Sequence, residues 1–208
     1  MPTRILLLRH AQSADPTIFH GAESDVGLSA LGRRQAELAA VYLASLRPDA
    51  VVSSQMRRAI DTATPIALAC GKTLHTEPDL HERRVGPMSG MLAQQPPDGP
   101  WPTTLRRWLA GETGYSPEGA ESFDDIRDRV LPVWHRLADQ YAGQTLVVVA
   151  HGIVCRVLIL SLLPGLSVAD WTTLGPIHNV AIHELMREDG EQEWHALRIN
   201  DLPYGWDE

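Results

Sequence analysis

The chain has 208 residues, a length that favours one domain or one domain with an insertion. Its formal net charge of -8 argues against a nucleic-acid partner, because proteins that bind nucleic acids usually carry a basic excess. No segment approaches the roughly twenty apolar residues of a membrane span, so we expect no membrane association and, by default, a cytoplasmic location. The two cysteines, Cys70 and Cys155, lack the spacing of a disulfide framework or a zinc knuckle, which indicates two core residues.

The first half of the chain alternates predicted strands and helices. Residues 4–9 are apolar in their middle, which is typical of a parallel strand covered on both faces. Ser29 is a good N-cap for a helix that Pro48 ends. A strand over residues 50–53 and a helix over residues 56–70 follow. The apolar face expected for the first helix consists of Leu31, Leu38, Val41, Tyr42 and Leu46.

A stretch rich in proline, glycine and tryptophan, residues 87–119, interrupts this alternation. We interpret it as a lid-like insertion in which only residues 105–110 have a helical pattern. The helical pattern resumes after Ser122, which is close to forming a capping box with Asp125. The remaining predicted elements are a strand over residues 145–150, a helix over 152–163, and two more exposed strands over 180–186 and 194–199.

Strands that alternate with helices predict the α/β class: a three-layer sandwich with a mostly parallel central sheet flanked by helices. We expect one α/β domain over residues 1–208, with the lid-like insertion inside it. In such sheets a ligand binds beyond the carboxyl ends of the strands. Polar residues that directly follow a predicted strand are therefore the first candidates for a functional site.

Two predicted strands end on a histidine. The first leads into Arg9 and His10, and the strand over residues 145–150 leads into His151 and Gly152. If the two strands are neighbours, both imidazoles lie in one crevice at the edge of the sheet. A single histidine in such a place is more often a strand-end residue that hydrogen-bonds a loop, but two in matching positions favour a site.

An arginine and a glutamate are the other candidates. Arg57 and Arg58 lie about 100° apart around a helix, so only one of them can face the crevice. Arg58 shares a face with Thr62 and is expected to point inward, whereas Arg57 can pair with Asp61 one turn later on the surface. Glu82 lies in a loop bordered by glycines.

Taken in order, these motifs resemble the histidine phosphatase superfamily, which includes the cofactor-dependent phosphoglycerate mutases and many small phosphatases. Each motif alone is weak, and their order makes the resemblance specific. The matching segments are Arg9–His10, the family's Arg-His-Gly with Ala11 in place of glycine, followed by "LSALGRRQA" (28–36), "SSQMRRAIDTA" (53–63), "ERRVGPMSG" (82–90), "GAESF" (119–123) and "VAHGIVCR" (149–156).

The resemblance implies a phosphoglycerate mutase-like fold and a set of roles. His10 would attack phosphorus and form a phosphohistidine, while Arg9, Arg58 and His151 would surround the phosphoryl oxygens. Glu82 would protonate the leaving oxygen and then deprotonate water. A small phosphorylated substrate is implied, with no metal and no cofactor, because the arginines replace the magnesium of other phosphoryl-transfer sites. The substrate-binding set implied is Arg9, Arg58, His151, Gly152, Gln12, Ser13 and Arg83.

Two departures from the family pattern shape the expected activity. Pro16 lies where an asparagine often contacts the phosphate, so Gln12 or Ser13 is expected to substitute. The sequence "ERRVG" (82–86) replaces the mutases' Glu-Arg-His-Tyr-Gly, and the insertion is short. We therefore expect a metal-independent phosphomonoesterase, a histidine phosphatase. The alternative is phosphoglycerate mutase-type phosphoryl transfer, and a non-catalytic phosphate-binding module is less favoured.

Several residues keep two interpretations. Trp101, Trp108 and Tyr115 would cover an apolar part of the substrate or form the insertion's own small core. A metalloenzyme is disfavoured, because none of the nine histidines has a partner at the spacing of a metal-binding motif. Four arginines would either reach a second acidic group on the substrate or be ordinary surface charges: Arg83, Arg84, Arg106 and Arg107.

Overall fold

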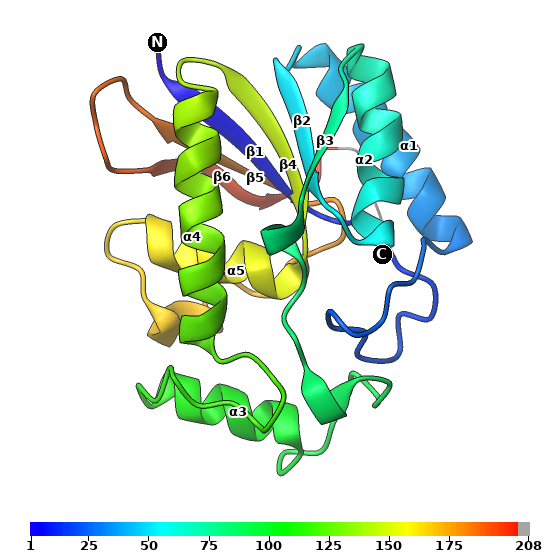
Figure 1. Ribbon diagram of the computed structural model, residues 1–208, viewed down its shortest axis with the longest axis vertical. Helices are drawn as coiled ribbons and strands as arrows, with labels where there is room; N and C mark the ends of the chain where they lie inside the picture. Colours follow the sequence, from blue (N-terminus) through cyan, green and yellow to red (C-terminus); the bar gives the residue numbers. More distant parts are fainter. Residues whose placement is uncertain (204–208) are drawn as a thin grey trace.

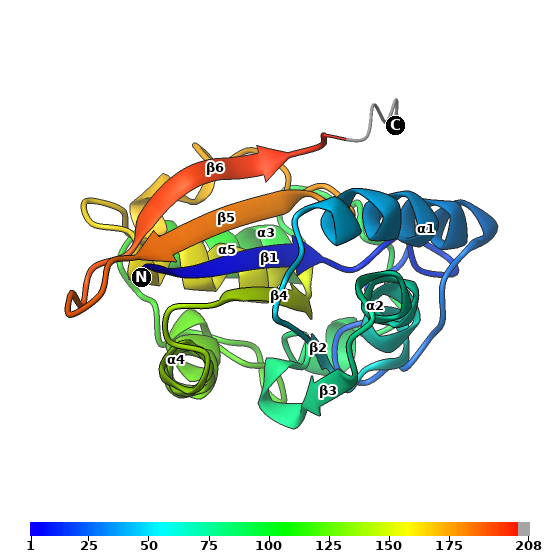
Figure 2. The same cartoon turned by 90° about the horizontal axis from the view of Figure 1, so that it is seen from above.

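The computed structural model describes residues 1–203 and is built around a six-stranded sheet with the strand order β3-β2-β4-β1-β5-β6. Figure 2 shows this order from β6 at the top to β3 at the bottom. The pairs β2–β3, β2–β4 and β1–β4 are parallel, whereas β5 is antiparallel to both of its neighbours. The strands are β1 (Thr3–Arg9), β2 (Ala50–Ser54), β3 (Leu74–Glu77), β4 (Thr145–Ala150), β5 (Ile182–Arg187) and β6 (His195–Asp201).

Helices cover both faces of the sheet, which confirms the predicted three-layer α/β sandwich (Figure 1). One face carries α1 (Ala30–Ser45) and α2 (Arg57–Cys70), and the other carries α4 (Phe123–Gln140) and α5 (Gly152–Leu162). The helix α3 (Pro100–Leu109) lies at one end of the molecule. Short 3-10 turns span Pro78–Leu80, Gly86–Met88 and Val168–Trp171. Within residues 1–203, no helix is both long and apolar enough to cross a bilayer.

The continuous apolar run of β1 follows from this layering. Ile5 and Leu7 pack into the core under α4 and α5, whereas Leu6 and Leu8 pack under α1 and α2. Because successive strand residues point to opposite faces, a strand with helices on both sides needs apolar residues at every position. The strand therefore ends as a rigid, buried element just before His10.

The apolar face predicted for α1 was wrong at three of its five residues, whereas Tyr42 and Leu46 pack against the core. Leu31, Leu38 and Val41 are 42%, 46% and 71% exposed, and the buried face is instead made of small residues such as Ala36 and Ala39. These alanines share a core cluster with the alanines of α2. Small side chains allow two helices to approach closely. A prediction based on the largest apolar residues does not detect such a face.

Three other elements differ from the predictions. The edge strand β3 was missed because it is short and half-exposed, without an alternating pattern. The helix in the insertion spans Pro100–Leu109 rather than residues 105–110, since Pro100 begins it. β5 begins at Ile182 and is buried, not exposed, because Ile182 and Leu185 pack into the two cores on opposite faces of the sheet. The division into one domain with a lid-like insertion over residues 87–119 stays a prediction.

Two adjacent positions on α1 test the corrected helix face. Ala39 is fully buried and Leu38 is 46% exposed. Ala39→Leu should overpack the contact with α2 and lower the free energy of unfolding by about 1–3 kcal/mol. Leu38→Ala should change it by no more than about 0.5 kcal/mol. Urea denaturation measures the free energy of unfolding of both variants. A larger decrease in Leu38→Ala than in Ala39→Leu would contradict the corrected helix face.

Candidate active site

The site is built on the tips of β1 and β4. These strands pair in parallel register, Arg9 opposite Ala150, so the residues that follow them are neighbours as well. The main-chain N–H of His10 donates to the carbonyl of Ala150 at 2.9 Å, which extends the ladder by one residue. The imidazole rings of His10 and His151 consequently lie 5.1 Å apart between centroids, at an angle of 61°.

Hydrogen bonds determine which nitrogen of His10 carries the proton. Nδ1 lies 2.7 Å from the carbonyl oxygen of Ala11, an acceptor, so Nδ1 holds the hydrogen and donates it. Nε2 is then the lone-pair nitrogen, and it accepts from Nε of Arg58 at 3.2 Å. Burial lowers the pKa of His10 well below its usual 6.5, and the positive charges of Arg58 and Arg9 lower it further. The ring is therefore neutral, with a nucleophilic nitrogen inside the site.

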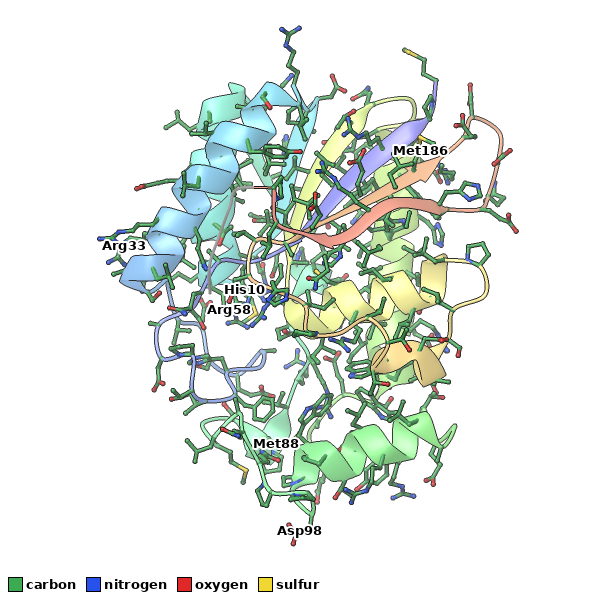
Figure 3. The ribbon with its side chains drawn as sticks, turned by 180° about the vertical axis from the view of Figure 1, so that it is seen from behind. His10, Arg33, Arg58, Met88, Asp98 and Met186 are labelled. Atoms are coloured by element: carbon green, nitrogen blue, oxygen red, sulfur yellow. The ribbon has the colours of Figure 1, made fainter. Side chains whose placement is uncertain are left out.

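Arg58 is the inward member of its pair. It is 2% exposed, and its two terminal nitrogens donate to the carbonyls of Ser24 (3.0 Å) and Gly21 (2.9 Å). Figure 3 shows His10 and Arg58 together below the sheet. Arg57, by contrast, points to solvent and reaches Asp61 at 3.8 Å. The helix phase predicted from the sequence is confirmed for both residues.

Arg9 and Gly152 meet where the two strand tips turn away from the sheet. Nη1 of Arg9 donates to the carbonyl of Ile177 at 2.6 Å. A Cβ at Gly152 would come within 3.4 Å of Nε of Arg9, so the missing side chain leaves room for the guanidinium. His151, the residue before, is fully buried, and neither of its ring nitrogens has a hydrogen-bond partner within residues 1–203. Burial, and then the charge of Arg58, lower the pKa of His151.

Glu82 is held by two main-chain N–H groups. Oε1 accepts from Arg83 at 2.9 Å and Oε2 from Ile153 at 3.4 Å. Ile153 lies in the first turn of α5. The carboxyl group is thereby fixed at the edge of the cavity that also contains His10.

These groups line one cavity of about 560 Å³. Its wall includes all of the candidate residues except His151, whose ring lies 5.1 Å from that of His10 between centroids. The candidates that line it are Arg9, His10, Gln12, Ser13, Arg58, Glu82, Arg83 and Gly152, together with Pro16.

Of the four arginines with two interpretations, only Arg83 lines this cavity. It is 1% exposed, and its guanidinium carbon lies 5.2 and 5.1 Å from the ring centroids of Trp101 and Trp108. Nε donates to the carbonyl of Glu121 at 2.8 Å, while Nη2 has no hydrogen-bond partner among the described residues. Burial lowers the pKa of Arg83 to about 10. The other three arginines, Arg84, Arg106 and Arg107, are exposed.

The aromatic residues of the insertion divide between the two interpretations. Trp108 is fully buried against Phe123 and Trp171, with ring centroids 5.9 and 5.5 Å away, so it belongs to the core. Its indole N–H donates to the carbonyl of Tyr115. Trp101 is half-buried and lines the cavity. Of the three aromatic residues with two interpretations, Trp101 alone lines the cavity and can meet a substrate.

Sequence reasoning missed many of the residues that line the cavity, among them Arg156, Ile177 and Asn179. Arg156 follows Gly152 by one helical turn, and that spacing was a usable signal. Ile177 and Asn179 lie in a loop with no periodic pattern, so no local feature of the sequence pointed to them.

Comparison with known proteins identifies the family. The model of the histidine phosphatase superfamily (branch 1) matches residues 5–201. The chain belongs to the histidine phosphatase superfamily. A glucosyl-3-phosphoglycerate phosphatase of Mycolicibacterium vanbaalenii is 34% identical over 199 residues, covering 90% of this chain and 87% of its own. A metal-independent phosphoserine phosphatase of Arabidopsis thaliana is 32% identical over 198 residues, covering 92% and 79%.

The solved structures agree with this identification. The native structure of a mycobacterial glucosyl-3-phosphoglycerate phosphatase matches with a TM-score of 0.81 and 30% identity, covering 96% of this chain and 99% of that one. The expected phosphoglycerate mutase-like fold is confirmed, as is the expected enzyme class, a phosphatase of this superfamily. Within residues 1–203, no group of three or more His, Cys, Asp or Glu side chains is arranged to hold a metal ion.

The buried histidines predict an acid-sensitive fold. His10 and His151 have lowered pKa values, and burial lowers the pKa of His183, whose Nδ1 accepts from the N–H of Asn200, to about 4. Below pH 6.5 the unfolded chain binds protons at these residues that the folded chain does not bind. The free energy of unfolding should therefore be highest above pH 6.5 and fall by up to about 1.4 kcal/mol per group and pH unit as the pH decreases toward the folded-state pKa values.

His183→Gln isolates one of these groups, because the Gln side chain keeps an acceptor for Asn200 while it does not titrate. Urea denaturation at pH 7.5 and pH 5.0 should show a smaller pH dependence in this variant than in the wild type. An equal pH dependence in the two proteins would contradict the assignment of His183.

Proposed function

We propose that the protein is a metal-independent phosphomonoesterase that works through a phosphohistidine on His10. The observation that carries the proposal is the state of the His10 imidazole. The lone pair of its Nε2 points to Arg58 inside the cavity, and burial keeps the ring neutral. A neutral imidazole nitrogen among fixed guanidinium groups is suited to attack an anionic phosphorus centre. A cytoplasmic location, which the composition favours, stays a prediction.

In the first step, Nε2 of His10 attacks phosphorus. A phosphorus–nitrogen bond forms while the bond from phosphorus to the ester oxygen breaks. Glu82 gives its proton to the departing oxygen, so the product leaves as an alcohol. Negative charge on the phosphoryl oxygens is stabilised by Arg9 and Arg58, and by an N–H of His151, whose ring lies beside that of His10 and has no other partner in the described chain.

In the second step, water attacks the phosphohistidine. Glu82, now a carboxylate, accepts the proton from water, and the phosphorus–nitrogen bond breaks to release inorganic phosphate. His10 returns to the neutral form that the Ala11 carbonyl orients. Two displacements replace one difficult step, and the same arginines hold the phosphoryl oxygens in both.

The cavity supports a small substrate that carries a second acidic group. Its volume of about 560 Å³ exceeds what a phosphoryl group alone requires, so most of it is available to the rest of the ester. Nη2 of Arg83 is a free buried donor in its wall, and Gln12, Ser13 and Gly152 line the same cavity. The relatives' names, glucosyl-3-phosphoglycerate and phosphoserine phosphatase, describe phosphorylated acids. We assign Arg83 to that second group.

Turnover of p-nitrophenyl phosphate tests the proposal. The wild type should hydrolyse it equally well with and without EDTA, and acid-labile phosphate should be trapped on the protein. His10→Ala should abolish both turnover and labelling, because it removes the attacking nitrogen. His195→Ala, a half-exposed histidine on β6, is the matched control and should retain full activity. Loss of turnover in EDTA, or labelling that survives in His10→Ala, would refute the proposal.

Glu82→Gln tests the proton transfer. The amide keeps the size of the carboxylate but cannot exchange a proton, so turnover at pH 6–7 should fall by roughly a hundredfold or more. Inhibition by inorganic phosphate should change little, because the arginines that bind it are intact. Glu118→Gln, at an exposed position of the insertion, should have no effect. Turnover of Glu82→Gln equal to wild type would remove Glu82 from the reaction.

A further inference from the structure

The loop of residues 176–180, which precedes β5, makes three hydrogen bonds to the two residues at the tip of β1. The side-chain amide of Asn179 donates to the main-chain carbonyl of His10 at 2.7 Å. The N–H of Val180 donates to the main-chain carbonyl of Arg9 at 3.0 Å. The carbonyl of Ile177 accepts from the guanidinium of Arg9 at 2.6 Å.

This loop completes a set of supports around the nucleophile. β4 holds the N–H of His10 through the carbonyl of Ala150, and Thr62 on α2 accepts the N–H of Ala11 at 3.0 Å. On the opposite side, the main-chain carbonyls of Arg9 and His10 accept from the N–H of Val180 and the side-chain amide of Asn179. The loop therefore supports that side of the tip.

The backbone of the loop is strained at the residue that bonds Arg9. Val180 has a φ of 54° and is fully buried. A β-branched residue in the left-handed region is a genuine outlier, because its side chain clashes with the main chain there. Such strain persists where surrounding contacts determine the conformation, and it is concentrated at functional sites.

A residue outside the cavity anchors the loop. Asn200 on β6 accepts the N–H of His178 at 3.0 Å and donates to the carbonyl of Pro176 at 2.7 Å. Its own backbone has a φ of 55°, which asparagine tolerates better than most residues. Its N–H donates to the imidazole of His183 on β5. Asn200 does not line the cavity, so it has no route to the substrate except through the loop.

We propose that the 176–180 loop is a positioning device for the phosphoryl-accepting histidine. Asn179 fixes the main chain of His10, Ile177 and Val180 fix Arg9, and Asn200 fixes the loop itself. The inference rests on the proposed function. Asn179 and Asn200 are positioning residues, and their loss should slow transfer to His10 more than it weakens phosphate binding. A misplacement of the reacting atoms by about 1 Å can cost up to about a hundredfold in rate.

Single-turnover rapid quench with p-nitrophenyl phosphate, which measures the rate of phosphohistidine formation per folded site, tests the role of Asn179. Asn179→Ala should lower this rate by about tenfold or more, with the final amplitude near that of wild type. Asn179→Asp keeps the shape but has no amide donor, so it should behave like Asn179→Ala. Rates within twofold of wild type in both variants would overturn the proposal, and so would a normal rate in Asn179→Asp alone.

Asn200→Asp tests the anchor, because it keeps the acceptor for His178 and loses the donor to Pro176. It should lower the rate by severalfold without changing inhibition by inorganic phosphate. Leu197→Ala, at a 55% exposed position on the same strand, is the matched control and should match wild type. An unchanged rate in Asn200→Asp would overturn the role of the anchor. A wild-type protein that forms no phosphohistidine would instead refute the proposed function.

Discussion

The parallel pairing of β1 with β4 is the constraint on which the site depends. The register that places Arg9 opposite Ala150 also places His10 beside His151, although residues 10–144 lie between the two strands. No local interaction between the histidines is needed, because two buried strands of fixed register bring their tips to the same edge. A slip of one residue would turn every side chain of β1 to the other face, into a core that packs differently, and would move His10 out of line with His151.

The burial that stabilises these strands also sets the chemistry of the residues that end them. His10 and His151 lie in the same dry environment as the strand ends, and desolvation keeps both imidazoles neutral. Exposed histidines would be partly protonated near pH 6.5 and would lose the lone pair needed for attack. The carbonyl of Ala11 then selects which nitrogen presents that lone pair, a detail fixed by the main chain that follows β1.

The sequence predicted what depends on strong local patterns. The apolar runs of β1 and β4, the inward turn of Arg58 and the ordered motifs led to the fold, the family and the polar candidates of the cavity wall. It failed where packing or remote contacts decide: the buried face of α1 consists of alanines because α2 lies close, and β3 is too short to show a pattern. The contact between Asn179 and His10 depends on the position of β5 next to β1 in the sheet. No residue near Asn179 in the sequence could therefore predict this contact.

Three arginines of the cavity, Arg58, Arg83 and Arg156, donate to main-chain carbonyls rather than to carboxylates in the described chain. Arg58 donates to the carbonyls of Gly21 and Ser24, and Arg83 and Arg156 likewise donate to main-chain carbonyls, of Glu121 and of Trp171 and Gly175. Within residues 1–203, no carboxylate forms a salt bridge with these three arginines. A carboxylate partner would neutralise the charge and compete with phosphate, whereas a carbonyl orients the guanidinium and leaves its charge for the ligand. A chain of net charge -8 thereby maintains a cationic cavity, and the cost of burying those charges is offset when an anion binds.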